Sequence, residues 1–154
     1  MDSKEPKVLL TEEGLKKLKA EYEDLINNKR QEVTEKIARA REFGDLSENS
    51  EYDTAREEQS FTEGRIMELE EILTHAKLVK KSNENKVGIG SKVKVQSGDS
   101  IDEYIIVSTV EANPMEGRIS IDSPVGKALL GSKVGDEVKI STNIQATYKV
   151  LEVK

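Results

Sequence analysis

Apolar residues recur at helical spacing along the first third of the chain. These positions are Leu15, Leu18, Tyr22, Leu25, Val33, Ile37 and Ala40. Intervals of three and four residues place side chains on one face of an α-helix, and the gradual shift of this stripe is typical of a long helix with a period of about 3.6 residues. Thr11 is placed to cap the start of the helix, and Gly44 is placed to end it.

A second helical stripe follows the break at Gly44 and Asp45. It comprises Thr62, Ile66, Leu69, Leu73 and Ala76. The simplest arrangement of two such stripes is an antiparallel coiled-coil hairpin, whose tip is residues 44–51. Roughly thirty residues per arm, at about 1.5 Å each, give a rod on the order of 45 Å long.

Beyond the hairpin the hydrophobic period changes from helical to alternating. Residues 83–89 are polar and Gly-containing and are predicted to link a hairpin domain, 1–82, to a C-terminal domain, 90–154. Short strand candidates are centred on Val93 and Val95, Tyr104 to Val107, Ile119 and Ile121, Val138 and Ile140, and Tyr148 and Val150. Ser123, Pro124 and Gly131 have the spacing of a short helix with its cap, first residue and stop. The predicted fold class is α+β: a helical hairpin followed by a small β-sheet domain with one short helix.

Composition limits the classes of function that suit this chain. Of the 154 residues, 35% are hydrophobic and 35% are charged, which predicts a limited core rather than one large globule. The absence of cysteine excludes disulfides and thiolate metal sites. The start lacks the apolar core of a signal peptide and the aliphatic runs are short, so we expect a cytoplasmic protein without membrane contact. A net charge of −6 makes direct binding to duplex DNA a poor hypothesis.

Acidic residues gather around the predicted tip. Between residues 42 and 58 stand seven acids, Glu42, Asp45, Glu48, Glu51, Asp53, Glu57 and Glu58, against the single base Arg56. Helix capping explains some of them, because Asp45 and Glu48 have the spacing of a capping box, and Ser47 is another candidate cap. Capping does not explain their number, since like charges one turn apart cost a few tenths of a kcal/mol per pair. The excess charge predicts a cation.

Magnesium suits this site best. It prefers hard oxygen ligands and is often held by one or two carboxylates, so Asp45 and Glu48 are the candidate metal ligands. A narrow tip lacks both a pocket and a complete ligand set, so a partner macromolecule should supply the rest of the site. A free-standing hydrolase is disfavoured, because the one histidine, His75, is predicted at the far end of the second arm.

Two segments carry a resemblance to a known family. "GDLSENSEYDTAREEQSF" and "ISIDSPVGKALLGSKVGDEV" resemble the bacterial Gre family of transcript-cleavage factors, and the resemblance extends over almost the whole chain. It implies a coiled-coil hairpin and an FKBP-like C-terminal domain that bind RNA polymerase at the mouth of its secondary channel. Asp45 and Glu48 would then help hold a magnesium ion shared with the polymerase, whose own active site cuts the backtracked 3′ end of the nascent RNA. The protein itself would not be an enzyme.

The same resemblance implies further site residues. Ser47 and Asn49 would orient the metal-binding acids, although both serve equally well as helix caps. Asp122, Ser123 and Pro124 would dock the C-terminal domain on the polymerase, although a Ser-Pro pair also starts a helix by itself. An alternative function is occupation of the polymerase channel without cleavage, which would inhibit transcription. Whether basic hairpin residues contact RNA or form an ordinary solvated face is left open.

Overall fold

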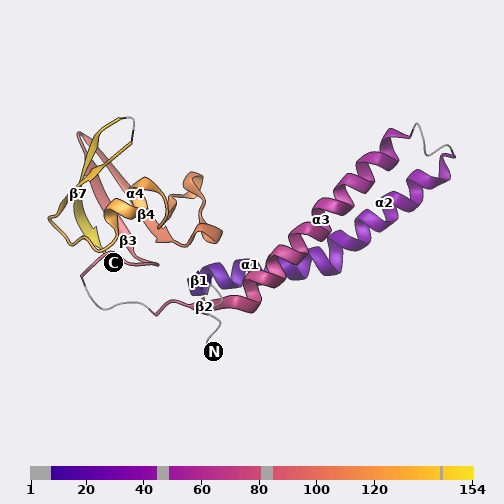
Figure 1. The fold of residues 1–154 in the computed structure, drawn as a ribbon, viewed down its shortest axis with the longest axis horizontal. Coiled ribbons are helices and arrows are strands. Elements are labelled where there is room, and N and C mark those ends of the chain that lie inside the picture. The colour runs from indigo at the N-terminus through magenta and orange to yellow at the C-terminus, as the bar shows by residue number, and fades with distance from the viewer. Residues whose placement is uncertain (1–7, 45–48, 81–84, 143) are drawn as a thin grey trace, which may run out of the picture. The chain divides into compact units, whose positions relative to one another are not determined.

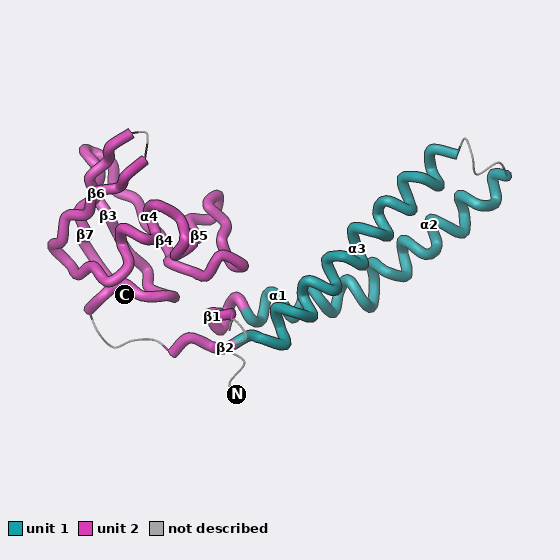
Figure 2. The backbone as a smooth tube through the Cα atoms, in the orientation of Figure 1, with its two compact units in different colours: residues 1–6, 15–76 teal, residues 7–14, 77–154 magenta. Residues whose placement is uncertain are grey.

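The computed structural model describes residues 8–44, 49–80, 85–142 and 144–154. The chain divides into two compact units, residues 1–6 with 15–76 and residues 7–14 with 77–154 (Figure 2). The first unit is helical and the second is built around a β-sheet (Figure 1). None of the helices in the described ranges is long and apolar enough to cross a membrane.

The helical unit is an antiparallel hairpin, as the two stripes predict. Its first arm comprises α1 (Glu12–Asp24), the π-helix η1 (Leu25–Lys29) and α2 (Arg30–Glu42), and α3 (Ser50–His75) runs back beside it (Figure 1). The buried side chains of α2 and α3 are Val33, Ile37, Ala40, Ala55, Thr62, Ile66, Leu69 and Ile72. At the start of α1, the Thr11 hydroxyl accepts a hydrogen bond from the Gly14 N–H at 3.0 Å, which confirms the predicted cap.

The π-helix η1 changes the phase of the apolar stripe within one turn. If the heptad spacing of Leu15, Leu18, Tyr22 and Leu25 continued along the helix, the next positions of the apolar stripe would be charged residues. These are Lys29, Glu32, Lys36 and Arg39. The buried residues Val33, Ile37 and Ala40 each come one position later. In η1 the Arg30 N–H donates to the Leu25 carbonyl, five residues back, so this turn absorbs one additional residue. The shift of the apolar stripe, which the sequence indicates as gradual, is therefore concentrated in η1.

Polar side chains connect the two arms along their middle. Arg30 donates two hydrogen bonds to Glu63, at 2.8 and 2.9 Å, and Arg65 donates two to Glu21, at 2.7 and 3.0 Å. The Tyr22 hydroxyl donates to Glu70 at 2.9 Å. Bidentate arginine–carboxylate pairs are more directional than single ion pairs, so these contacts fix the alignment of α3 against the first arm.

The second unit contains a five-stranded mixed sheet. Its strands, in the order β5-β4-β3-β7-β6, are β3 (Lys92–Ser97), β4 (Ser100–Val107), β5 (Arg118–Ser120), β6 (Glu137–Ile140) and β7 (Ala146–Val153). Strands β4 and β5 pair in parallel, and the other neighbours are antiparallel. Leu129 of α4 (Pro124–Leu129) belongs to the buried core with Val93, Val95, Ile106 and Val150. The predicted strands, the short helix and the α+β class are confirmed.

Two three-residue strands were not predicted. β1 (Val8–Leu10) and β2 (Ala76–Leu78) form a separate two-stranded sheet, and the Val79 N–H donates to the Leu10 carbonyl at 2.9 Å. The helical stripe predicts a helix through Ala76, but α3 ends at His75. Segments this short are too brief to show the alternation that identifies a strand.

Glu111 forms a buried polar contact with the first turn of α1. Glu111 ends the 3₁₀-helix η2 (Thr109–Glu111), and another such turn, η3 (Pro114–Glu116), precedes β5. The Glu111 side chain is 2% exposed and accepts hydrogen bonds from the Thr11 N–H, the Thr11 hydroxyl and Arg118, at 2.9, 2.6 and 3.0 Å. Arg118 also lies 3.5 Å from Glu13. A buried charge with several partners is tolerated where an isolated one is not.

Candidate functional site: the hairpin tip and the Ser-Pro turn

Gly44 ends the first arm of the hairpin. Helix α2 closes at Glu42, with Phe43 as its C-cap, and Gly44 adopts the left-handed conformation at φ 94°. Its N–H donates to the Arg41 carbonyl at 3.3 Å. A residue with a Cβ is strained at this φ, so glycine is the natural stop, as predicted.

Asn49 begins the second arm and ties it to the first. Its side-chain oxygen accepts from the N–H groups of Glu51 and Tyr52, at 3.1 and 3.2 Å, and its amide nitrogen donates to the Ala40 carbonyl at 2.7 Å. Asn49 is thus the N-cap of α3. Of the capping candidates, Asn49 is the one that the structure describes in this role.

Asp45, Ser47 and Glu48 lie outside the described residues, so their predicted roles remain predictions. They belong to the four residues that join Gly44 to Asn49. Both flanking residues are held by hydrogen bonds to the last turn of α2. The described structure therefore defines the residues that precede and follow these four.

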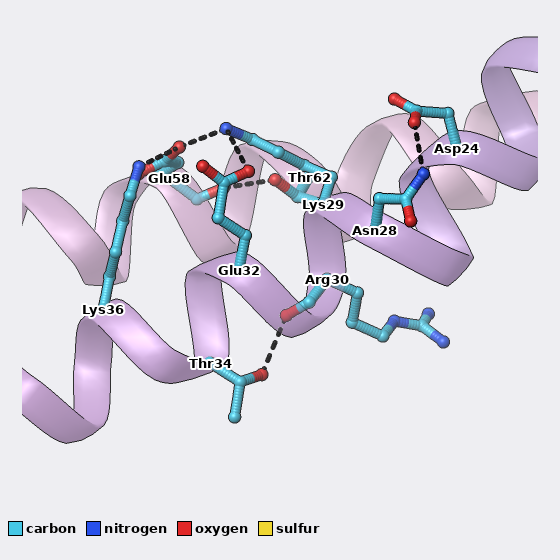
Figure 3. Close-up of polar contacts among 9 residues, drawn as sticks. All are labelled: Asp24, Asn28, Lys29, Arg30, Glu32, Thr34, Lys36, Glu58 and Thr62. Carbon is cyan, nitrogen blue, oxygen red and sulfur yellow. Dashed lines mark hydrogen bonds and ion pairs between the residues drawn. The ribbon is translucent and has the colours of Figure 1, made fainter.

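The acids of α3 fall into two groups. Glu51, Asp53 and Glu57 are exposed, and no salt bridge joins them to a cation in the described part of the chain. Glu58 differs, because its carboxylate lies 2.5 Å from Lys29 Nζ and 3.0 Å from Lys36 Nζ (Figure 3). Hydrogen bonds from these two lysines lower the pKa of Glu58 below its ordinary value. Glu58 therefore belongs to the contact between the arms, and the unneutralised charge lies nearer the tip.

A groove beside the tip was not predicted from the sequence. It has a volume of about 500 Å³, and its lining includes Arg39, Phe43, Ser50 and Glu51. Phe43 is 75% exposed. A single aromatic residue at the end of a helical stripe gives no sign in the sequence that it borders a groove, because that depends on the start of the second arm.

The chemistry of the tip donors fits magnesium. Asp45 and Glu48 offer carboxylate oxygens, which this hard ion prefers. Two carboxylates are too few for octahedral coordination, so an ion bound by them would need further ligands from elsewhere. Among the described residues, no group of three or more acidic, histidine or cysteine side chains is placed to hold a metal ion.

The Ser-Pro turn separates into a structural part and an exposed part. The Ser123 hydroxyl accepts from the Gly126 N–H at 3.0 Å and donates to the Ser120 carbonyl at 2.7 Å, so it caps α4. Pro124 occupies the first turn of α4 and is exposed, as is Asp122. Asp122 accepts a hydrogen bond from the Thr109 hydroxyl at 2.5 Å. Thr109, thirteen residues earlier, was not among the predicted site residues.

The fold defines a class of protein: a helical hairpin, whose two arms are joined by a segment with two acidic residues, combined with a small mixed-sheet domain. Family models match both parts, as "Transcription elongation factor, N-terminal" over residues 8–78 and "Transcription elongation factor, GreA/GreB, C-term" over residues 81–154. The chain belongs to the GreA/GreB family of transcription elongation factors.

Proteins named transcription elongation factor GreA match the chain over nearly its full length. The protein of Thermoanaerobacter pseudethanolicus is 51% identical over 152 residues, which are 96% of this chain and 97% of that protein. The protein of Clostridium acetobutylicum is 46% identical over 157 residues, covering 99% of each. Among solved structures, GreA factor homolog 1 of Thermus thermophilus is 30% identical, with 96% and 99% of the two chains covered and a TM-score of 0.45.

Proposed function

We propose that this protein stimulates cleavage of backtracked RNA by bacterial RNA polymerase. The hairpin enters the secondary channel of the polymerase and brings Asp45 and Glu48 to its active site. The observation that carries this proposal is the position of Asp45 and Glu48 in the sequence, between Gly44, which ends the first arm, and Asn49, which begins the second. Asn49 caps α3, so the start of this helix has a side-chain cap of its own.

The residues of this chain have distinct tasks in the proposed reaction. Asp45 and Glu48 supply two of the oxygen ligands of a magnesium ion shared with the polymerase. When bound, such an ion lowers the pKa of a coordinated water and stabilises charge that develops on the reacting phosphate. Asn49 ties the start of α3 to Ala40, at the end of the first arm. The polymerase supplies the remaining ligands and performs the hydrolysis.

The hairpin acts as a stiff support for the segment that carries Asp45 and Glu48. Burial of apolar side chains and the bidentate pairs formed by Arg30 and Arg65 hold the arms together. A rigid support limits the entropy lost when the acids enter the active site, which improves catalysis by orientation. In the second unit, the exposed Asp122 and Pro124 provide the docking contact with the polymerase.

The proposal is tested on a stalled, backtracked elongation complex, whose RNA is sized after incubation with magnesium and the protein. We expect shortening of the RNA with wild-type protein, and a rate more than about tenfold lower with Asp45→Asn or Glu48→Gln, because amides are poorer magnesium ligands. Asp53→Asn is the matched control, since it removes an exposed acid one turn into α3, and it should cleave normally. RNA of unchanged length with excess wild-type protein would refute the proposal.

Two further measurements separate this function from its alternatives. Incubation of the same RNA with the protein alone tests for nuclease activity of its own, and we expect none. Nucleotide addition by an active elongation complex tests for a channel-blocking inhibitor. Inhibition of synthesis without RNA shortening would favour that alternative, whereas the presence of both Asp45 and Glu48 favours cleavage. The proposed partner places the protein's action in the cytoplasm.

A further inference from the structure

Thr109, Ser120 and Asp122 form a closed set of hydrogen bonds at the surface of the second unit. The Thr109 hydroxyl donates to Asp122 Oδ2 at 2.5 Å, and it lies 2.9 Å from the Ser120 hydroxyl. The Asp122 N–H donates to the Ser120 hydroxyl oxygen at 3.0 Å. An ionised carboxylate only accepts, so Thr109 gives its one proton to Asp122 and Ser120 must donate to Thr109. The direction of every bond in the set is thereby determined.

This set restrains a charge that the second unit does not neutralise. Asp122 is exposed, and in the described part of the chain no lysine or arginine forms a salt bridge with it. An exposed aspartate ordinarily samples several side-chain rotamers. Here the Thr109 hydroxyl holds Oδ2, which restrains the carboxylate and so limits the directions in which it can meet a partner.

The local fold does not depend on the Asp122 side chain. The Ser123 hydroxyl caps α4, and the Ile121 N–H donates to the Val107 carbonyl at 2.9 Å. The Ser123 N–H also donates to the Ser120 carbonyl at 3.1 Å. Backbone bonds and the serine cap thus hold the turn on both sides of Asp122, so the Thr109–Asp122 bond serves the orientation of the carboxylate.

We propose that Thr109 is a positioning residue that orients Asp122 to bind a cationic side chain, arginine or lysine, of RNA polymerase. The inference rests on the proposed function, because it requires Asp122 to contact the polymerase. A restrained carboxylate binds a cation with less loss of side-chain entropy than a free one. Hydrogen bonds between the Asp122 carboxylate and a cationic side chain are also stronger than those between neutral groups. Thr109 therefore contributes to affinity without touching the partner.

The test is the affinity of the full-length protein for RNA polymerase, measured at two salt concentrations for a set of variants. Thr109→Val keeps the β-branched shape and removes the hydroxyl, and we expect affinity to fall about tenfold. Thr109→Ser keeps the hydroxyl and should stay within about threefold of the wild type. Asp122→Asn should bind at least as weakly as Thr109→Val and should lose part of the salt dependence.

The double variant Thr109→Val/Asp122→Asn distinguishes positioning from an independent contact. If Thr109 acts through Asp122, the double variant binds no more weakly than Asp122→Asn alone. The factor concentration for half-maximal RNA cleavage should rise for Thr109→Val in step with the loss of affinity, with little change in the maximal rate. A purely structural role of Thr109 would not raise the half-maximal factor concentration while leaving the maximal rate unchanged. Nor would it predict near-wild-type affinity for Thr109→Ser.

Each other outcome overturns a specific statement. Wild-type affinity of Asp122→Asn would refute the docking role of Asp122 and the inference with it, while RNA cleavage by the wild type would leave the proposed function standing. Weak binding of Asp122→Asn with wild-type affinity of Thr109→Val would refute the inference alone, and so would additive losses in the double variant. If Thr109→Val melts early, Thr109→Ala replaces it, since it also removes the hydroxyl that donates to Asp122. Wild-type affinity of folded Thr109→Ala would then overturn the inference.

Discussion

Replacing Gly14 by alanine tests the buried contact between the first turn of α1 and Glu111. An added Cβ would lie 1.8 Å from Oε1 and 2.1 Å from Cδ of Glu111, far inside van der Waals contact. The three nearest atoms all belong to the Glu111 side chain, so this side chain must swing away. It then gives up its hydrogen bonds to Thr11 and leaves Arg118, whose side chain is 7% exposed, with Glu13 as its remaining salt-bridge partner among the described residues.

Two effects of opposite sign decide the stability of Gly14→Ala. Helix propensity favours alanine over glycine by at most about 1 kcal/mol. Breaking a buried ion pair costs about 3–5 kcal/mol. The lower end of that range applies, because Arg118 keeps a second partner and the displaced carboxylate reaches water. We therefore expect a net loss of about 2 kcal/mol in the free energy of unfolding of the second unit. Propensity alone predicts a gain.

Native-state hydrogen exchange of the buried amides of Val93 and Val95 measures this free energy for the second unit. Gly64→Ala is the matched control, since Gly64 is also helical and, apart from the neighbouring residues and backbone of its own helix, no atom lies within 4 Å of its added Cβ. It should stabilise the hairpin by about 0.5–1 kcal/mol, as followed by circular dichroism. If Gly14→Ala stabilised its unit as the control stabilises the hairpin, the close packing of Glu111 on Gly14 would be refuted.

Three further changes test the hairpin. Asn49→Ala removes the cap of α3 and should lower hairpin stability by about 1 kcal/mol in thermal unfolding, with slower RNA cleavage; an unchanged melting temperature would contradict the capping role. The pKa of Glu58 is lowered in the folded protein, so ionised Glu58 stabilises the hairpin. This contribution is complete above the ordinary pKa of 4.5 and is lost as the pH falls through the lower pKa of the folded state. Glu58→Gln should therefore flatten the decline of the melting temperature between neutral pH and about pH 3. Deletion of Asn27 should convert η1 to an α-helical turn and retain the helical circular dichroism signal of the hairpin. Deletion of Glu35, which lies in α2, should destabilise the hairpin. Equal losses of stability in the two deletion variants would refute the role of the π turn.

The parts of the fold that sequence reasoning predicts are those in which one pattern repeats. The hairpin arms carry apolar residues over many turns, and α4 is marked by Ser123, Pro124 and Gly131 together. β1 and β2 have three residues each, too few for a period to appear. The partners Thr11 and Glu111 are 100 residues apart, and neither differs in sequence from an ordinary surface residue.

The candidate site is predicted unevenly for the same reason. The acids of the tip are conspicuous because their charges accumulate in a short segment. Asn49 was recognised only as a residue that either orients the acids or caps a helix, and the structure assigns the cap through its bonds to Glu51 and Tyr52. The sequence does not identify Thr109 as a site residue. Its partner Asp122 follows β5 in the chain whereas Thr109 precedes it, and no spacing rule connects residues in different elements.

The π turn explains why the arms are joined differently along their length. No side chain of η1 is buried, so the apolar seam is interrupted at this turn. Charged contacts replace it there, with Glu58 between two lysines and Arg30 paired with Glu63. Partly exposed ion pairs contribute less to stability than buried apolar side chains do. Cohesion of the hairpin beyond the interruption therefore depends on the apolar cluster of Val33, Ile37 and Ala55, against which Tyr52 packs.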